Sequence, residues 1–165
     1  GIYSQLAPKM IPSSQSLSES MSMSDSIEKL QNFIEENPDD FQALKMLGLA
    51  QIGIGNVNES IKAFESAYLI NSKDIDLLLQ FASAIAASQD GQFDGKSKVL
   101  IDEALSLDSQ SIQVLYFSGI VSAHEGNLND AIEFWEKALY LMSNDHPDRN
   151  IIEEALGTVL NLQVK

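Results

Sequence analysis

Cysteine is absent from this chain of 165 residues. Disulfide bonds, thiol catalysis and zinc–thiolate sites are therefore excluded, whereas an oxidising and a reducing compartment remain equally compatible with the sequence. The two histidines, His124 and His146, stand in no metal-ligand spacing, and no glycine-rich phosphate loop is present. Because catalysis requires several converging groups, we predict a protein that is not an enzyme and that carries no metal or cofactor.

Apolar runs long enough to cross a bilayer are missing, although a hydrophobic fraction of 44% is enough for the packed core of one domain. Basic residues are also scarce, since 10 Lys and Arg stand against 24 Asp and Glu and give a formal net charge of −14. Such a surface repels phosphate backbones and anionic membranes, so we expect no nucleic-acid partner. A basic or neutral polypeptide is favoured, although acidity also keeps proteins soluble.

The sequence does contain a repeated helix–turn–helix pattern. At one common offset, the residues Leu44, Gly48, Gly55, Phe64 and Ala67 have counterparts in Leu115, Gly119, Gly126, Trp135 and Ala138. A middle copy, with Leu78 and Ala82 in the first helix, follows after roughly 34 residues, which is the period of tetratricopeptide (TPR) units. A longer turn, SQDGQFDGKS, displaces its second helix. Small residues let the helices approach, and large ones such as Trp135 are expected in the core.

We therefore predict an all-α fold, a TPR solenoid of about three helix hairpins with one helix before them and a capping helix after them. Residues 1–24, rich in Ser, Pro and Met, are interpreted as a flexible tether, and residues 25–165 as the TPR domain. The helices are expected at about 25–36, 41–53, 58–70, 75–88, 96–107, 112–124, 129–142 and 149–162.

The ends of these helices carry recognisable capping residues. We expect N-caps at Asp25 or Ser26, at Asp39 or Asp40, at Asn58 and at Asn129. Gly55 and Gly126 stand where a left-handed turn residue is needed. The middle turn, with Asp90 and Asp94, is interpreted as a surface loop, because it lacks the remaining ligands and the closing Glu of a calcium-binding loop. His124 is interpreted as a partly exposed structural histidine.

Function is expected on the concave side, which the first helix of each hairpin lines in this architecture. Most of the side chains expected there are apolar or small: Gln42, Lys45, Leu49, Ile52, Asp76, Leu79, Ser83, Ala86, Gln113, Tyr116, Ile120 and Ala123. Such a groove suits an amphipathic helix or an extended apolar tail, held mainly by buried area. The alternative is that the C-terminal helix or the tether fills the groove itself.

Some TPR domains clamp a C-terminal carboxylate between Lys, Asn and Arg side chains. Lys45 could be one member of such a clamp, but Leu49 stands where Asn is required, and Gln113 and Phe117 stand where Lys and Arg are required. We therefore expect no carboxylate clamp, and a receptor for chaperone tails of the heat-shock type is disfavoured.

Several stretches resemble one family in particular: ENPDDFQALKMLGLAQIGIGN, the longer middle turn leading into VLIDEALSLDSQ, and VLYFSGIVSAHEGNLNDAIEFWEKALYLM with its trailing helix. Together, over about residues 25–162, they resemble the periplasmic domain of bacterial cytochrome c assembly factors of the CcmI/CycH type. The nitrite-reductase assembly protein of the NrfG type is similar. The opening GIY…LAP resembles the segment after the second membrane helix of that family, which implies a membrane anchor ahead of Gly1.

The resemblance implies a non-enzymatic chaperone or adaptor of c-type cytochrome maturation, located in the periplasm and attached to the inner membrane. Such a protein binds the C-terminal helix of apocytochrome c, here in the concave groove, and delivers it to the haem-ligation machinery, whose subunits would be further partners. Two alternatives stay open. One is a generic TPR scaffold that joins folded subunits of a complex, and the other is a nitrite-reductase haem-lyase assembly subunit.

Overall fold

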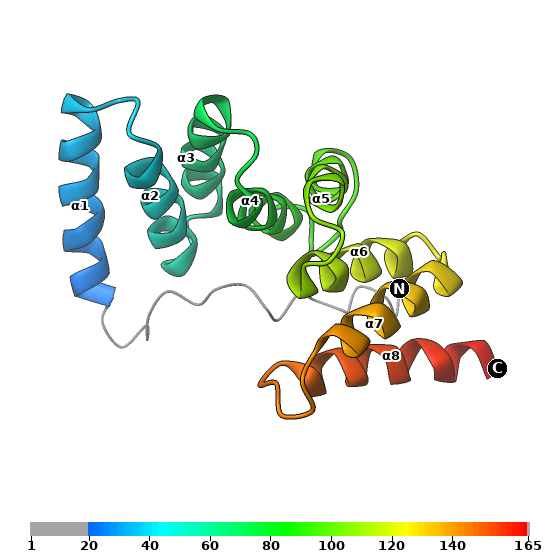
Figure 1. The fold of residues 1–165 in the computed structure, drawn as a ribbon. Helices are drawn as coiled ribbons and strands as arrows, with labels where there is room; N and C mark the ends of the chain where they lie inside the picture. The colour runs from blue at the N-terminus through cyan, green and yellow to red at the C-terminus, as the bar shows by residue number, and fades with distance from the viewer. Residues whose placement is uncertain (1–19, 165) are drawn as a thin grey trace.

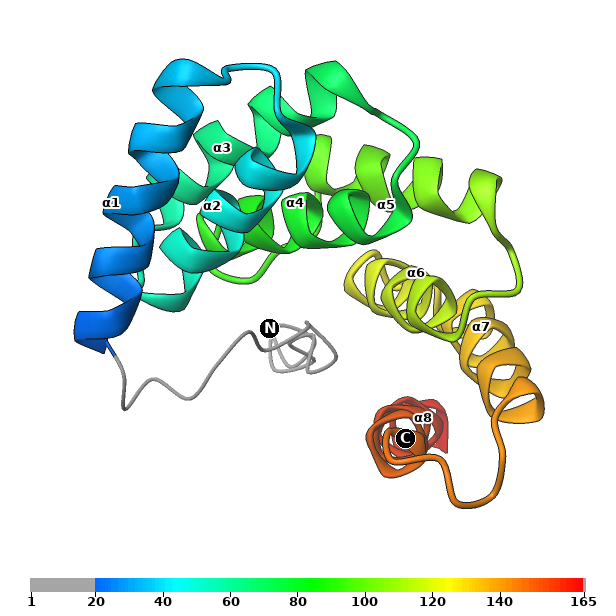
Figure 2. The ribbon, with the colours of Figure 1, turned by 60° about the vertical axis from the view of Figure 1, so that its left-hand side comes forward.

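The computed structural model describes residues 20–164, which form eight α-helices. In chain order these are α1 Ser20–Glu36, α2 Phe41–Gly53, α3 Val57–Ile70, α4 Ile75–Ala87, α5 Lys96–Leu107, α6 Ile112–His124, α7 Leu128–Leu141 and α8 Arg149–Val164. Each helix packs chiefly on the helices before and after it, so the pairs α2–α3, α4–α5 and α6–α7 follow one another along an arc (Figures 1 and 2). The predicted all-α TPR architecture is confirmed.

The repeat positions explain how closely the paired helices pack. Gly48 on α2 faces the ring of Phe64 on α3, and Gly119 on α6 faces the indole of Trp135 on α7. A Cβ atom at either glycine would overlap the facing ring, so the missing side chain is what lets each pair of helices approach. Trp135 is fully buried, as predicted, and its Nε1–H donates a hydrogen bond to the carbonyl of Tyr116 at 3.1 Å.

Helix α8 follows the third hairpin and differs from the first helices of the hairpins. Counted from the helix starts, Ile152 takes the place that Leu115 has in α6, and it is buried in the same way. The place of Gly119, however, is taken by Leu156, so the surface that would receive another helix carries a large side chain. With Ala155 and Val159 buried as well, α8 packs on α7, which agrees with the predicted capping helix.

The first helix begins earlier than its sequence suggested. The N-caps predicted at Asp25 or Ser26 are wrong, because both residues lie inside α1, which begins at Ser20. The cause is tertiary, since Met23 and Ile27, four residues apart, are buried together with Ala50 of α2. Residues 20–24 therefore belong to a helix. Residues 1–19 lie outside the described range, and their role as a tether stays a prediction.

The caps of the hairpins are only partly as predicted. Asp40 is the N-cap of α2, and its Oδ1 accepts a hydrogen bond from the backbone N–H of Ala43 at 2.9 Å. Asn58 and Asn129 are not caps, because α3 and α7 begin one residue before them, at Val57 and Leu128. The reason lies in the turns that precede these helices.

Gly55 and Gly126 have φ values of 86° and 81°, as predicted for left-handed turn residues. The next residue in each turn, Asn56 or Asn127, donates its backbone N–H to a carbonyl five residues earlier, at 2.9 or 2.8 Å. These are Schellman turns, in which the residue after the glycine closes the first helix. That residue is at once the N-cap position of the next helix, although neither Asn side chain makes a capping hydrogen bond.

The long middle turn is more than a surface loop. Asp90 and Asp94 are exposed as expected, but Phe93 between them is 1% exposed and is part of the core. Its ring meets the ring of Phe117 edge-on, with 5.9 Å between centroids, and lies 6.1 Å from the ring of His124. The longer turn thus folds an aromatic side chain back against α6. His124 is half-buried, as predicted.

A hydrogen bond between Tyr68 of α3 and Glu103 of α5 joins two successive hairpins. The Tyr68 hydroxyl donates to both carboxylate oxygens of Glu103, at 3.1 and 3.0 Å. Burial, followed by the hydrogen bond and the charge of Glu103, raises the pKa of Tyr68 above its ordinary value. The phenol is therefore protonated at neutral pH and acts as the donor.

Replacing Tyr68 by Phe is expected to lower the free energy of unfolding by about 1 kcal/mol at neutral pH, because the edge-on contact with Phe81 survives while the hydrogen bond is lost. Since the pKa of Tyr68 is raised on folding, its stabilising contribution is complete below about pH 10 and is lost as the pH rises through the folded-state pKa. Urea unfolding of both proteins at about pH 7 and pH 11 measures this. A difference that persists undiminished at pH 11 would contradict it.

Candidate peptide-binding groove

The twelve side chains predicted to line the concave groove all lie on α2, α4 and α6, the first helices of the three hairpins. Six of them are exposed or half-buried: Gln42, Lys45, Leu49, Ile52, Asp76 and Gln113. The other six are buried: Leu79, Ser83, Ala86, Tyr116, Ile120 and Ala123. The accessible members thus belong to α2 and to the first turns of α4 and α6.

The six buried members lie on α4 and α6, two helices that are buried over most of their length. Every residue from Leu77 to Ala86 in α4, and from Val114 to Ala123 in α6, is buried. A helix that is apolar all round is usually enclosed on all sides, whereas α2 leaves Gln42, Met46 and Lys45 at least partly accessible. The repeat positions placed the twelve residues on the first helices of the hairpins, but they gave no information about which of these side chains are accessible. A partner can reach the six buried side chains only after they become exposed.

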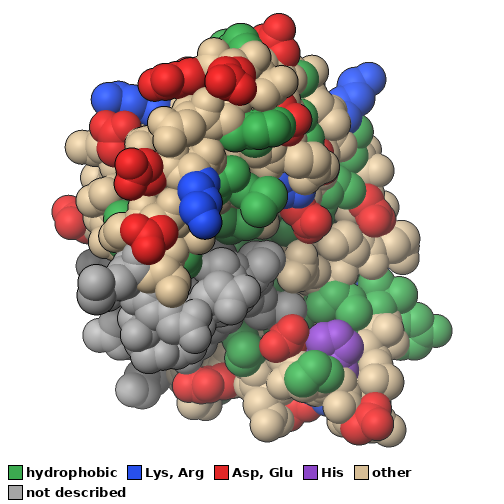
Figure 3. All heavy atoms as spheres, turned by 90° about the vertical axis from the view of Figure 1, so that its left-hand side faces the viewer, with side chains coloured by type: hydrophobic (Ala, Val, Ile, Leu, Met, Phe, Trp, Pro, Cys, Tyr) green, Lys and Arg blue, Asp and Glu red, His purple; other side chains and the backbone are tan. Residues whose placement is uncertain are grey.

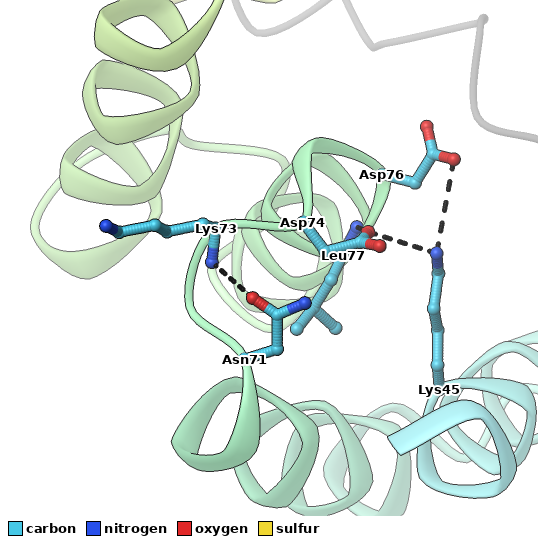
Figure 4. Close-up of polar contacts among 6 residues, drawn as sticks. All are labelled: Lys45, Asn71, Lys73, Asp74, Asp76 and Leu77. Atoms are coloured by element: carbon cyan, nitrogen blue, oxygen red, sulfur yellow. Dashed lines mark hydrogen bonds and ion pairs between the residues drawn. The ribbon is translucent and has the colours of Figure 1, made fainter.

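A charged corner lies where α2 meets the start of α4 (Figure 4). Lys45 extends from α2 so that its Nζ lies 3.0 Å from Oδ1 of Asp74 and 4.0 Å from Oδ2 of Asp76. Its ammonium also lies 5.8 Å from the centre of the Phe41 ring. The Lys45 side chain is 13% exposed, that of Asp74 25% and that of Asp76 62%. The charged corner therefore combines the largely buried ammonium of Lys45 with the accessible carboxylate of Asp76.

Asp74 has a second role that fixes its position. It is the N-cap of α4, and the carboxylate oxygen that pairs with Lys45 also accepts the backbone N–H of Leu77 at 2.8 Å. In Figure 4 the side chain of Lys73 points away from this corner, while its backbone N–H donates to Asn71 Oδ1 at 3.0 Å. Asp74 is not among the twelve predicted groove residues. The capping pattern at the start of α4 was the available signal for its position.

The face at the α1 end of the array shows the acidic character that the composition predicts. On the face at the α1 end of the array, Asp and Glu side chains are spread widely and hydrophobic side chains gather between them (Figure 3). Among residues 20–164 no group of three or more His, Asp or Glu side chains could hold a metal ion. Within the same range, no helix has both the length and the apolar content that crossing a membrane requires. The six accessible members of the predicted groove are Leu49 and Ile52, which are apolar, Asp76, which is acidic, Lys45, which is basic, and the amides Gln42 and Gln113.

The sequence matches a family model described as the cytochrome c-type biogenesis protein H TPR domain, over residues 3–149. The cytochrome c-type biogenesis protein CycH of Pseudomonas aeruginosa is 29% identical over 132 residues, which cover 80% of this chain and 32% of that protein. CcmH of Escherichia coli K12 is 24% identical over 127 residues, or 77% of this chain and 36% of that protein. The chain thus spans about a third of the length of these two relatives.

A third relative belongs to another system. The formate-dependent nitrite reductase complex subunit NrfG of Escherichia coli O157:H7 is 25% identical over 117 residues, which cover 71% of this chain and 59% of NrfG. Among solved structures, MamA superposes with a TM-score of 0.71 at 18% identity, covering 97% of this chain and 80% of MamA. The Yersinia enterocolitica type III secretion chaperone SycD, solved with a peptide of the translocator YopD, gives 0.63 at 13% identity, covering 75% of this chain and 94% of SycD. These two structures support the TPR fold.

Proposed function

Because the chain belongs to the family of cytochrome c-type biogenesis protein H TPR domains, we propose that it is a non-enzymatic adaptor of c-type cytochrome maturation. It binds the C-terminal helix of apocytochrome c on its concave side and delivers it to the haem-ligation machinery. Its place of action is the periplasm, at the inner membrane, together with the subunits of the haem-ligation complex. The observation that supports this function best is the accessible apolar surface of α2 beside the charged corner.

The chemistry of this surface favours one kind of partner. Leu49 and Ile52 lie one turn apart on α2 and are half-buried, so they retain apolar area that a partner can cover. The exposed carboxylate of Asp76, on the first turn of α4, lies 4.0 Å from the ammonium of Lys45, which is on α2 like Leu49 and Ile52, and the net charge of the chain is −14. A helix that is apolar on one face and basic at its flanks complements both features. Neither feature favours a nucleic acid.

We expect the partner to bind first at the six accessible groove residues. The partner helix covers Leu49 and Ile52 and reaches the first turns of α4 and α6 through Asp76 and Gln113. The six buried residues join the interface only where α4 and α6 expose them. Leu79 and Tyr116 are therefore poor positions for a binding test, since substitutions at buried sites primarily change stability.

Replacing Leu49 by Asp is expected to weaken binding of a synthetic C-terminal cytochrome c helix at least tenfold, or about 1.4 kcal/mol, because the substitution removes apolar contact area from the accessible wall. Isothermal titration calorimetry measures this effect, starting from a micromolar affinity for the unmodified domain. Leu69→Asp is the matched control. Leu69 is 81% exposed on α3, a second helix, and is not among the twelve predicted groove residues.

The two substitutions separate the proposed function from its alternatives. Equal loss of binding in both variants, or no loss in Leu49→Asp when circular dichroism shows both proteins to be folded, would contradict binding on the concave side. Ile52→Ala is a second, milder test of the same accessible surface of α2. A tighter complex with a C-terminal peptide from a nitrite reductase than with one from a cytochrome c would favour the role suggested by the resemblance to NrfG.

A scaffold that joins folded subunits is the second candidate, and a separate observation favours it. The last residues of α3, α5 and α7 are Ile70, Leu107 and Leu141, which are 42%, 43% and 37% exposed. Beside them, Leu69 and Tyr140 are 81% and 88% exposed. Repeated apolar side chains at the ends of the second helices suit contact with a folded protein surface. Loss of subunit assembly, but not of peptide binding, in Leu69→Asp would support this role.

A further inference from the structure

The accessible part of the groove contains one basic side chain, Lys45, among its twelve predicted members. This residue matters because the proposed partner segment is a C-terminal helix, which ends in a carboxylate. An unpaired ammonium on the groove wall would attract that carboxylate and would fix the end of the partner in the groove. The position of Lys45 therefore bears on whether the domain recognises the end of its partner or its side.

The Lys45 ammonium already has its counter-ions within the domain. It pairs with Asp74 at 3.0 Å and has Asp76 at 4.0 Å, and its side chain is 13% exposed. Turning toward a partner carboxylate would break the pair and leave Asp74 without a cation in a site that is only 25% exposed. Removing one member of such a pair carries a desolvation cost for the other.

Asp74 cannot follow Lys45, because it also caps α4. Its Oδ1 accepts the Leu77 N–H at 2.8 Å, and losing this bond would leave an N-terminal donor of the helix without its cap. The nearby Asp76, 62% exposed, adds a negative charge where an arriving carboxylate would have to lie. Lys73 does not compensate, since its side chain points away from the corner in Figure 4.

We propose that the groove recognises the side of its partner helix and not its terminal carboxylate, and that Asp74 and Asp76 determine this specificity by neutralising Lys45. The inference rests on the proposed function and adds to it the kind of polypeptide that the groove accepts. A helix within a chain, or one whose end is amidated, binds as well as a helix with a free carboxyl terminus. Basic side chains of the partner are tolerated at Asp76, and acidic ones are not.

The test compares two peptides of one sequence, a C-terminal cytochrome c helix with either a free carboxylate or an amide at its end. With the unmodified domain, we expect calorimetry to show that the amide peptide binds as tightly as the carboxylate peptide or up to threefold more tightly. In Asp74→Asn/Asp76→Asn the order reverses, and the carboxylate peptide binds several-fold tighter, because Lys45 has lost both counter-ions. Asn at position 74 keeps the cap of α4, so this variant is expected to fold.

Adding Lys45→Met to the double variant is the matched control, and it is expected to abolish the acquired preference for the carboxylate. A preference of more than threefold for the free carboxylate in the unmodified domain would overturn the inference, as would a double variant with no change of order. Failure of both peptides to bind the unmodified domain would instead contradict the proposed function, and with it this inference. The rate of acetylation by acetic anhydride measures how accessible the Lys45 ammonium is. We expect Lys45 to react several-fold more slowly than the exposed Lys73.

Discussion

Replacing Trp135 by Ala is expected to destabilise the domain by about 3–5 kcal/mol. The indole of Trp135 is fully buried, lies against Gly119 and donates its hydrogen bond to the Tyr116 carbonyl. Truncation therefore leaves a cavity between α6 and α7 and removes the hydrogen bond that the indole donates. Thermal unfolding followed by circular dichroism should show a midpoint lower by about 10 °C.

Trp135→Phe provides the matched control, because the equivalent position of the first hairpin is occupied by Phe64, which also packs against a glycine. We expect this substitution to cost less than half as much as Trp135→Ala, since a phenyl ring fills most of the space while the hydrogen bond is lost. Equal destabilisation by Phe and Ala would mean that the hydrogen bond, and not the filled volume, holds α6 and α7 together.

Replacing Phe93 by Ala is the second large effect, with an expected destabilisation of about 3 kcal/mol. Phe93 belongs to the long middle turn, but its ring is buried between Phe117 and His124. Its removal leaves a cavity against α6 without disturbing any helix cap. Urea unfolding of the variant and of the unmodified protein measures the difference.

Asp90→Asn in the same turn is the control for Phe93→Ala. Asp90 is exposed and has a φ of 56°, a left-handed conformation that Asn adopts as readily as Asp. We expect its substitution to change stability by less than about 0.5 kcal/mol. If Phe93→Ala were equally mild, the turn would be a surface loop, as its polar sequence suggested, and the packing of Phe93 would contribute little.

The hairpins could be predicted from the sequence because their signal is repeated. Gly48 and Gly119, with Phe64 and Trp135 opposite them, recur at one offset, and the repeat fixed the helix bounds to within about two residues from α2 to α8. Features that occur once were harder to predict. Phe93 is the one aromatic residue in a polar turn, and this contrast with its neighbours was the only sign in the sequence that it is buried.

The start of α1 and the exposure of the predicted groove residues could not be predicted, because both depend on contacts between helices. A serine-rich stretch has a low intrinsic helix propensity, and Met23 becomes part of a helix through its packing on α2. Likewise, repeat position identified Leu79 and Ile120 as groove residues, but only the packing of whole helices shows that they are buried. The pairing of Lys45 with Asp74 depends on how one hairpin stacks on the next.

The most direct test of binding on the concave side is a two-dimensional amide NMR titration of the domain with the C-terminal helix of a cytochrome c. If the helix binds on the concave side, the largest chemical-shift changes will cluster on α2 and on the first turns of α4 and α6, around Leu49, Asp76 and Gln113. Changes that cluster instead at the ends of α3, α5 and α7, around Leu69 and Tyr140, would contradict this mode of binding.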